Sequence, residues 1–165
     1  MLDTVTRYLN PFDNIRGYNL LRILTPLADR LSSQPLTSAG LVIKAGGGVL
    51  AKTGAAAFYA TAAGIPVTIA AATDMPSLTG LVITAANFNV ACFFIDSASV
   101  VTMAAGTQAT TIAGVKFPQF PQGKALVGFL LITHSSTFTG GTTALDTATT
   151  VYVSPLGPFD PTCLV

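Results

Sequence analysis

The chain has 165 residues, of which 50% are hydrophobic and only 9% are charged. Ordinary soluble domains carry about 25% charged residues, so a surface this poor in charge favours burial against identical subunits or a larger assembly. The net charge of +1 provides no electrostatic footprint for nucleic acid, and we expect no nucleic-acid partner.

The charged residues divide the chain into two parts. Of the fifteen (eight Lys or Arg and seven Asp), seven lie in residues 1–39 and eight in the remaining 126 residues. The start of the chain lacks a basic segment followed by an apolar one, so we expect no signal peptide. No apolar run approaches the roughly 18 residues of a membrane span, so we expect no membrane partner. We predict an N-terminal arm, residues 1–39, and a β domain, residues 40–165.

The arm carries apolar residues at helical spacing, with charged residues largely on the other side. The apolar set is Leu20, Leu21, Leu24, Leu27, Ala28 and Leu31. Because Pro26 cannot lie inside a straight helix, the sequence predicts two short helices, over about 15–24 and 26–32, and then a linker over Ser32–Ala39. Helices this short need tertiary partners. The arm packs either on its own domain or on a neighbouring molecule, and we favour the neighbour.

From Gly40 onward, short β-type runs alternate with turn residues. The predicted strands are Leu41–Ala45, Val49–Lys52, Ala56–Ala60, Ile65–Ala71, Gly80–Thr84, Asn89–Ile95, Val100–Ala104, Thr111–Val115, Ala125–Thr133 and Thr149–Val153. Strict alternation is lost in Val90–Ile95 and Ala125–Ile132, which predicts strands buried on both faces. The sequence therefore predicts an all-β fold, an antiparallel β-sandwich or jelly-roll-like barrel with a partly helical N-terminal arm.

Glycine and proline residues determine the secondary structure that we predict for Gly54–Ala72 and the position of the strand that contains Pro66. The alanine-rich stretch Gly54–Ala72 has helical propensity, but Gly54, Gly64 and Pro66 confine it, and we expect strand and turn. Pro66 has no backbone N–H to donate to a neighbouring strand. We therefore expect either that its strand lies at the edge of a sheet or that the proline lies near the start of the strand.

No pattern in the sequence indicates catalysis, a cofactor or a metal. The glycines in Ala45–Val49 lack the Lys-Ser/Thr and helix of a phosphate loop and predict a hairpin turn. The only histidine, His134, predicts a polar strand-end residue and not a member of a triad. The isolated aspartates predict turn roles: Asp74, Asp96, Asp146 and Asp160. Cys92 and Cys163 predict a buried thiol and a tail thiol. We expect a protein that is not an enzyme.

The segment Phe117–Pro121 differs from the other loops. Its two prolines restrict the chain to an extended path, and Phe117 and Phe120 need something to cover them. We predict a subunit contact through these two rings.

Several sequence blocks occur in an order that resembles a known family. They are GLVIKAGGGVLAKTG (Gly40–Gly54), FNVACFFID (Phe88–Asp96), VKFPQFPQGKALVGFLLI (Val115–Ile132), FTGGTTALD (Phe138–Asp146) and VYVSPLGPFDP (Val151–Pro161). This order resembles small virion structural proteins of tailed bacteriophages, of the head-decoration or head-fibre type, and leaves Met1–Ala39 unmatched. The resemblance implies a non-enzymatic capsid component made in the host cytoplasm and located on the capsid surface, and a homotrimer at a symmetry point of the shell.

Two hypotheses follow. In the first, the chain is a capsid decoration (cement) protein whose β domain forms a trimeric knob and whose arm contacts the major capsid protein. The arm residues expected to make this contact are Tyr8, Phe12, Tyr18, Leu20, Leu21 and Leu24. In the alternative, the chain is a receptor- or carbohydrate-binding module of a phage fibre or tail appendage, and binds glycans through a loop such as Ser135–Gly141.

Overall fold

The computed structural model of the chain describes residues 24–25 and 27–159. This part is built mostly of β-strands, with a helix over residues 24–25 and 27–32 and a short 3-10 helix, η1 (Ile112–Gly114). The strands are β1 (Gln34–Pro35), β2 (Val42–Ile43), β3 (Ala51–Lys52), β4 (Phe58–Ala62), β5 (Ile65–Ile69), β6 (Val82–Ile83), β7 (Phe88–Ile95), β8 (Val101–Ala105), β9 (Ala125–Thr133), β10 (Phe138–Thr139) and β11 (Thr149–Val153). All pairings between these strands are antiparallel, which confirms the predicted all-β sandwich.

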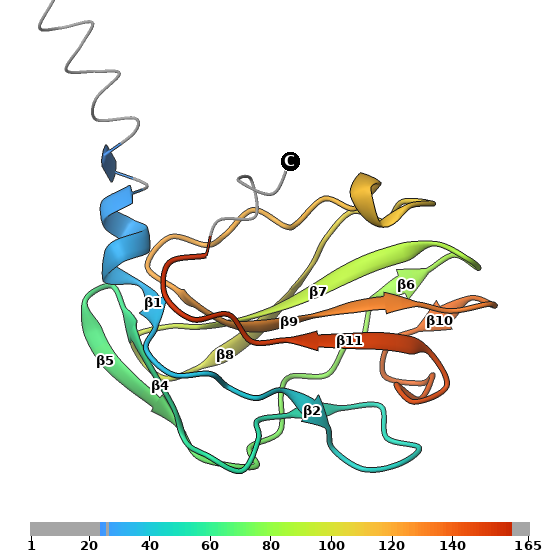
Figure 1. The fold of residues 1–165 in the computed structure, drawn as a ribbon, viewed down its shortest axis with the longest axis horizontal. Coiled ribbons are helices and arrows are strands. Elements are labelled where there is room, and N and C mark those ends of the chain that lie inside the picture. Colours follow the sequence, from blue (N-terminus) through green and yellow to red (C-terminus); the bar gives the residue numbers. More distant parts are fainter. Residues whose placement is uncertain (1–23, 26, 160–165) are drawn as a thin grey trace, which may run out of the picture.

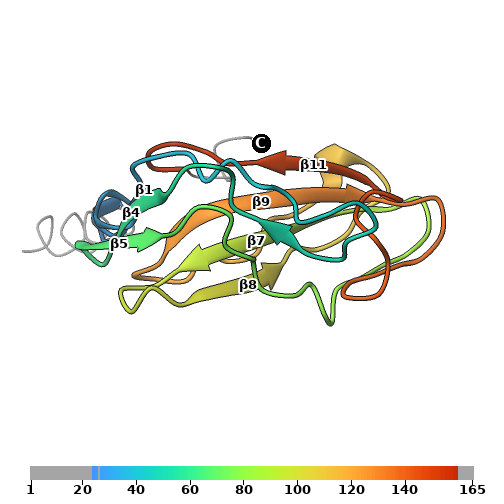
Figure 2. The ribbon, with the colours of Figure 1, turned by 90° about the horizontal axis from the view of Figure 1, so that it is seen from below.

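The largest sheet has four strands in the order β11-β9-β7-β8, with β9 and β7 in the middle (Figure 1). Three smaller units form the second layer: the sheet β1-β4-β5 and the pairs β2-β3 and β6-β10. Figure 2, seen from below, shows β2, β4 and β5 in front of the large sheet. The main core lies between the layers, where Phe93 and Val127 of the large sheet meet Phe58, Ile83 and Phe138 of the second layer.

Both faces of the two central strands are buried, as the loss of alternation predicted. On β7, Phe93 and Ile95 enter the main core, whereas Cys92 and Phe94 lie on the opposite face. On β9 a bulge interrupts the register, because Phe93 pairs with Gly128 while Phe94 pairs with Leu126. The extra residue, Val127, lets Val127 and Leu130 both enter the main core although they are three positions apart.

The alanine-rich stretch forms the hairpin β4–β5, which confirms strand and turn over helix. Its two loop residues, Ala63 and Gly64, have φ of 51° and 77°, the left-handed pair that a type I′ turn requires. Pro66 lies in β5, at the edge of its sheet, as predicted. The glycines of Ala45–Val49 lie in the loop of the β2–β3 hairpin, where Gly48 N–H donates to the Ala45 carbonyl oxygen at 2.9 Å.

Three local predictions were wrong or incomplete. Ser32–Ala39 is not a linker, because β1 pairs with β4, and Ser33 is buried with its Oγ accepting from the Ala63 N–H at 2.9 Å. Thr111–Val115 is not a strand: Thr107 bridges to Lys116, and the residues between them form a loop that contains η1. No strand was predicted between Ala125–Thr133 and Thr149–Val153, yet Phe138–Thr139 forms the short strand β10 in the second layer.

Of the predicted arm, residues 1–39, the structure describes only residues 24–25 and 27–39. The predicted helix over 26–32 is confirmed for residues 27–32, and most of the predicted helix over 15–24 lies outside the described residues. Residues 34–39 belong to the sandwich and not to the arm, since they include β1 and the buried Ala39. No helix in the described part of the chain is long and apolar enough to cross a bilayer.

Candidate interaction surface

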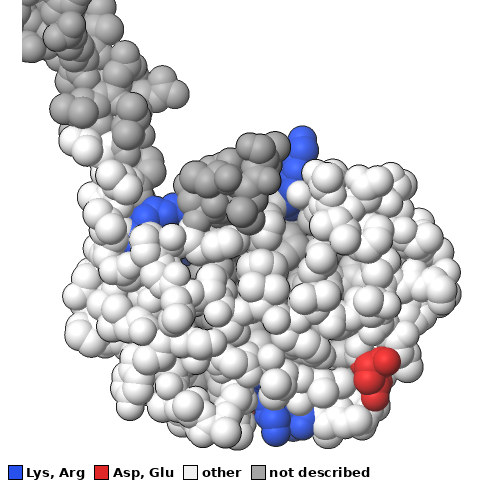
Figure 3. Space-filling model, in the orientation of Figure 1, with Lys and Arg blue, Asp and Glu red and all other residues white. Residues whose placement is uncertain are grey.

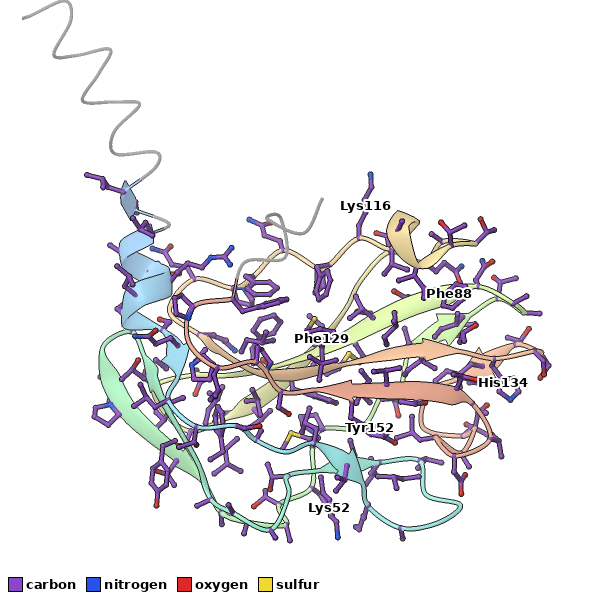
Figure 4. The ribbon with its side chains drawn as sticks, viewed as in Figure 1. Lys52, Phe88, Lys116, Phe129, His134 and Tyr152 are labelled. Atoms are coloured by element: carbon purple, nitrogen blue, oxygen red, sulfur yellow. The ribbon has the colours of Figure 1, made fainter. Side chains whose placement is uncertain are left out.

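The outer face of the large sheet is covered by an aromatic cluster (Phe94, Phe117, Phe120, Phe129 and Phe159). The segment after η1 crosses this face and places the Phe117 ring edge-on against Phe129 and the Phe120 ring edge-on against Phe94, each with centroids 5.0 Å apart. Phe159 lies among them, with its centroid 5.6 Å from that of Phe129. Figure 4 shows Phe129 on β9 beneath this segment, on which Lys116 points outward.

These contacts identify what covers the two rings of Phe117–Pro121. Phe117 and Phe120 are partly buried against residues of their own chain, in a second core that also holds Cys92 and Leu126. The two rings are therefore covered, at least in part, without a neighbouring molecule. The subunit contact predicted for Phe117 and Phe120 stays a prediction, and it would have to use only the part of each ring that remains exposed.

Polar contacts fix the helix over 27–32 against this cluster. Asp29 Oδ1 accepts from the backbone N–H of Gly123 at 2.9 Å, and Arg30 Nη1 donates to the Phe159 carbonyl oxygen at 2.8 Å. The Arg30 guanidinium also lies 4.9 Å from the centroid of the Phe120 ring, within cation–π range. A groove of about 320 Å³ runs beside these contacts, lined by Thr25, Asp29, Arg30, Gln119, Phe120 and Gln122. The two hydrogen bonds join residues 94 and 129 positions apart, so no local sequence pattern could predict them.

The opposite side of the helical residues 24–25 and 27–32 is apolar and exposed. Leu24, Leu27 and Leu31, called the leucine stripe below, are 44%, 50% and 53% exposed. An isolated surface helix normally turns its apolar side toward its own core. Here the charged side faces the domain and the leucines face outward.

The described surface is also poor in charge. In Figure 3 charged side chains occupy a few separated points on one face, and uncharged residues fill the area between them. Large apolar side chains more than two-fifths exposed are spread over several elements: Leu36, Val42, Tyr59, Ile65, Val82, Val100, Ile112, Val151 and Leu156. Single exposed apolar residues are normal, but this number on a nearly uncharged surface favours contact with other protein.

The ionisable groups stabilise loops and show no catalytic arrangement. Asp96 accepts from the N–H groups of Val100 and Ala98, each at 3.0 Å. The hydrogen bond from Val100 is the main cause that holds the pKa of the Asp96 carboxyl below its usual value. The bond from Ala98 and the charge of Lys124 lower this pKa further. This is the predicted turn role. Asp146 instead binds a distant hairpin, accepting from Gly47 N–H at 2.6 Å.

Burial shifts the pKa of two further groups. It raises the pKa of the Cys92 thiol, which confirms the predicted buried thiol and keeps it protonated at neutral pH. Burial also raises the pKa of Tyr152, and the Asp146 charge adds to this effect. Neither group faces a nucleophile–base pair of the kind that covalent catalysis needs. Cys163 lies outside the described residues.

His134 follows the last residue of β9, as predicted, at one end of the sandwich (Figure 4). Its Nδ1 accepts from the Ser136 N–H at 3.1 Å, so it is bonded within its own loop. An open hollow of about 340 Å³ beside it is lined by Ala86, Thr133, His134, Ser135, Thr147 and Thr149. Among residues 24–25 and 27–159, no three His, Cys, Asp or Glu side chains come together as a metal site would require.

The predicted site residues divide as follows. Tyr8, Phe12, Tyr18, Leu20 and Leu21 lie outside the described residues, as does Asp160. Leu24 lies on the leucine stripe, and Phe117 and Phe120 lie in the aromatic cluster. Asp74 does not have the predicted turn role: its backbone forms a β-bridge with Lys52, and its carboxylate pairs with Lys44.

Comparison of the chain with protein-family models, with curated proteins and with solved structures found no match.

Proposed function

We propose that this chain is a non-enzymatic structural protein of a virion, a capsid decoration (cement) protein that oligomerises on a phage head and stabilises it. The observation that carries the proposal is a surface nearly without charge that exposes apolar side chains around a small, well-packed sandwich. Such a surface is suited to broad contact with protein and not to a small polar substrate. The sequence resemblance to head-decoration proteins supports the same reading.

In this proposal the sandwich and the N-terminal arm have different roles. The sandwich supplies a compact knob, and the chain before the helix supplies the arm residues Tyr8, Phe12 and Tyr18 for the major capsid protein. A protein that binds only the assembled shell stabilises that shell by mass action, by about 2.7 kcal/mol per site at a hundred times the dissociation constant.

Little in the structure supports the alternative, a receptor- or carbohydrate-binding module of a phage fibre or tail appendage. The loop Ser135–Gly141 contains one aromatic residue, Phe138, and its side chain is fully buried in β10. The other residues of this loop are serines, threonines and glycines, so no aromatic platform faces solvent from it. Micromolar binding on a glycan array would nevertheless favour this alternative over decoration.

The proposal is tested with heads of the parent phage prepared without this protein. We expect the purified chain to co-sediment saturably with these heads and to raise their melting temperature. Failure to co-sediment at any concentration would reject the decoration role.

The arm contact is tested with matched tyrosines. Tyr8→Ala should weaken binding to heads more than Tyr59→Ala, which truncates a half-exposed tyrosine on β4. Equal binding by both variants would show that this arm residue does not contact the capsid.

A further inference from the structure

The last described residues of the chain lie against the groove beside the helix. This groove, called the Arg30 groove below, has Arg30 and Phe120 in its wall. Arg30 Nη1 donates to the Phe159 carbonyl oxygen at 2.8 Å, and the Phe159 ring stacks on that of Phe120 with centroids 6.3 Å apart. Residues of the groove wall therefore hold both the backbone and the ring of Phe159.

A narrow cleft also joins Phe159 to this groove. The cleft shares Asp29, Arg30 and Phe120 with the groove, and Phe159 lines it as well. Its volume of about 20 Å³ holds about one water molecule, so Phe159 packs closely on the groove wall. In Figure 1 the chain after β11 and the chain between η1 and β9 both turn at the corner of the sandwich that carries the helix. The chain beyond Phe159 therefore starts beside the groove.

The residues that follow Phe159 in the sequence can reach the groove. They are the six residues 160–165, called the tail below. Pro161 favours an extended conformation at the residue before it, Asp160. An extended chain spans about 3.3–3.6 Å per residue, so Cys163, four positions beyond Phe159, can reach about 14 Å from it. The groove, whose wall contacts Phe159 directly, is within this distance.

The charges of the groove wall and of the tail are complementary. Arg30 is the positive residue of the wall, and the negative Asp160 is the only charged residue of the tail. Asp160 directly follows Phe159, whose carbonyl oxygen Arg30 already binds. Asp29, the negative residue of the wall, accepts a backbone hydrogen bond at 2.9 Å. Opposite charges this close in the chain favour a tail that stays beside Arg30.

The other residues of the wall suit an extended apolar segment. Gln119 and Gln122 carry side-chain amides, which can donate to and accept from the backbone of such a segment. Phe120 adds an apolar surface, and the tail contains the apolar Leu164 and Val165. The groove therefore offers both the hydrogen bonds and the apolar contact that the tail requires.

We propose that the tail occupies the Arg30 groove of its own chain. There it lies between the helix and the segment Phe117–Pro121 and joins the two. A partner that approaches the exposed part of Phe120 from this side must first displace the tail. The inference concerns contacts within one chain and does not rest on the proposed function.

The first test traps the tail through its own thiol, Cys163, in the full chain without heads. Gln122→Cys places a second thiol in the groove wall, and the buried Cys92 does not compete. The matched control is Leu156→Cys, because Leu156 is exposed, lies outside the groove lining and is seven positions from Cys163. A tail bound in the groove has a higher effective concentration there. Under mild oxidation we therefore expect Gln122→Cys to form a disulfide within the chain about tenfold faster than Leu156→Cys.

The second test measures how fast Cys163 reacts with a thiol reagent in the native chain. Phe120→Ala removes the aromatic wall of the groove, so Cys163 should react several-fold faster than in the wild type. Leu156→Ala, the matched control, should leave the rate unchanged. Cys92 is buried, so its reaction, followed by peptide mass, shows whether a variant has unfolded.

Equal rates for the two cysteine variants, or faster cross-linking of Leu156→Cys, would overturn the inference. A disulfide that Gln122→Cys forms between chains would also overturn it and would assign the groove to another copy. So would a Cys163 rate that Phe120→Ala leaves unchanged in a folded chain. Capsid decoration is tested with heads and these readouts without them, so neither result decides the other.

Discussion

Truncation of Phe120 tests whether the aromatic cluster holds the domain together from within one chain. Phe120→Ala removes an edge contact with Phe94, a stacked contact with Phe159 and the cation–π contact with Arg30, at centroid distances of 5.0, 6.3 and 4.9 Å. The ring is only partly buried, so we expect about half of the roughly 3–5 kcal/mol that Phe→Ala costs in a full core. The cation–π contact adds about 0.5–1 kcal/mol at such a site. The expected loss is therefore about 2–3.5 kcal/mol in the free energy of unfolding.

Urea unfolding followed by circular dichroism measures this loss, with Leu156→Ala as the control. Leu156 is largely exposed, and its truncation should change the free energy of unfolding by less than about 0.5 kcal/mol. The difference between Phe120→Ala and the wild type should be the same at every protein concentration. A loss below about 0.5 kcal/mol would refute the reasoning, and a loss that varies with concentration would place Phe120 in a subunit contact.

Three further predictions concern single positions. A Cβ at Gly128 would lie 2.5 Å from the Val153 carbonyl oxygen, so Gly128→Ala should cost about 1–3 kcal/mol by urea unfolding, whereas Gly46→Ala, with open space around it, should cost far less. Because the pKa of Asp96 is lowered in the folded chain, its charge contributes stability above the ordinary carboxyl pKa, and this is lost as pH falls through the lowered value. The melting temperatures of the wild type and Asp96→Asn should therefore differ near neutral pH and converge in acid. In a Cys163→Ser chain, Cys92 should react with a thiol reagent only after unfolding, and fast reaction of the native chain would contradict its burial.

The strands with the strongest local signals were predicted well from the sequence. Ala125–Thr133 and Thr149–Val153 match β9 and β11, since each is a run of β-forming residues bounded by turns. The two-residue strands β1 and β10 were not predicted, because each depends on a partner far along the chain, β4 and β6 respectively. Thr111–Val115 has β-type composition, but the fold supplies no strand beside it.

The sequence predicted which residues could form the candidate interaction surface, but not how the fold arranges them. The leucine spacing of the arm and the extended path of Phe117–Pro121 are properties of local sequence, and both could be read directly. Which side of the helix faces the domain depends on Gly123 and Phe159, and no local pattern connects these residues to Asp29 and Arg30. For the same reason, sequence alone could not show that Phe94 and Phe129 cover Phe117 and Phe120.

The central position of β9 has a consequence for how the protein is made. Its neighbours β7 and β11 both pair with it, yet β9 begins only at residue 125 of 165. During synthesis, β7 therefore emerges with two apolar faces and without one of its two partner strands until most of the chain has left the ribosome. Exposed apolar surface of this kind promotes aggregation of unfinished chains, and distant pairings slow folding to about milliseconds to seconds. Slower synthesis at reduced temperature and an abundant chaperone supply should accordingly raise the soluble yield.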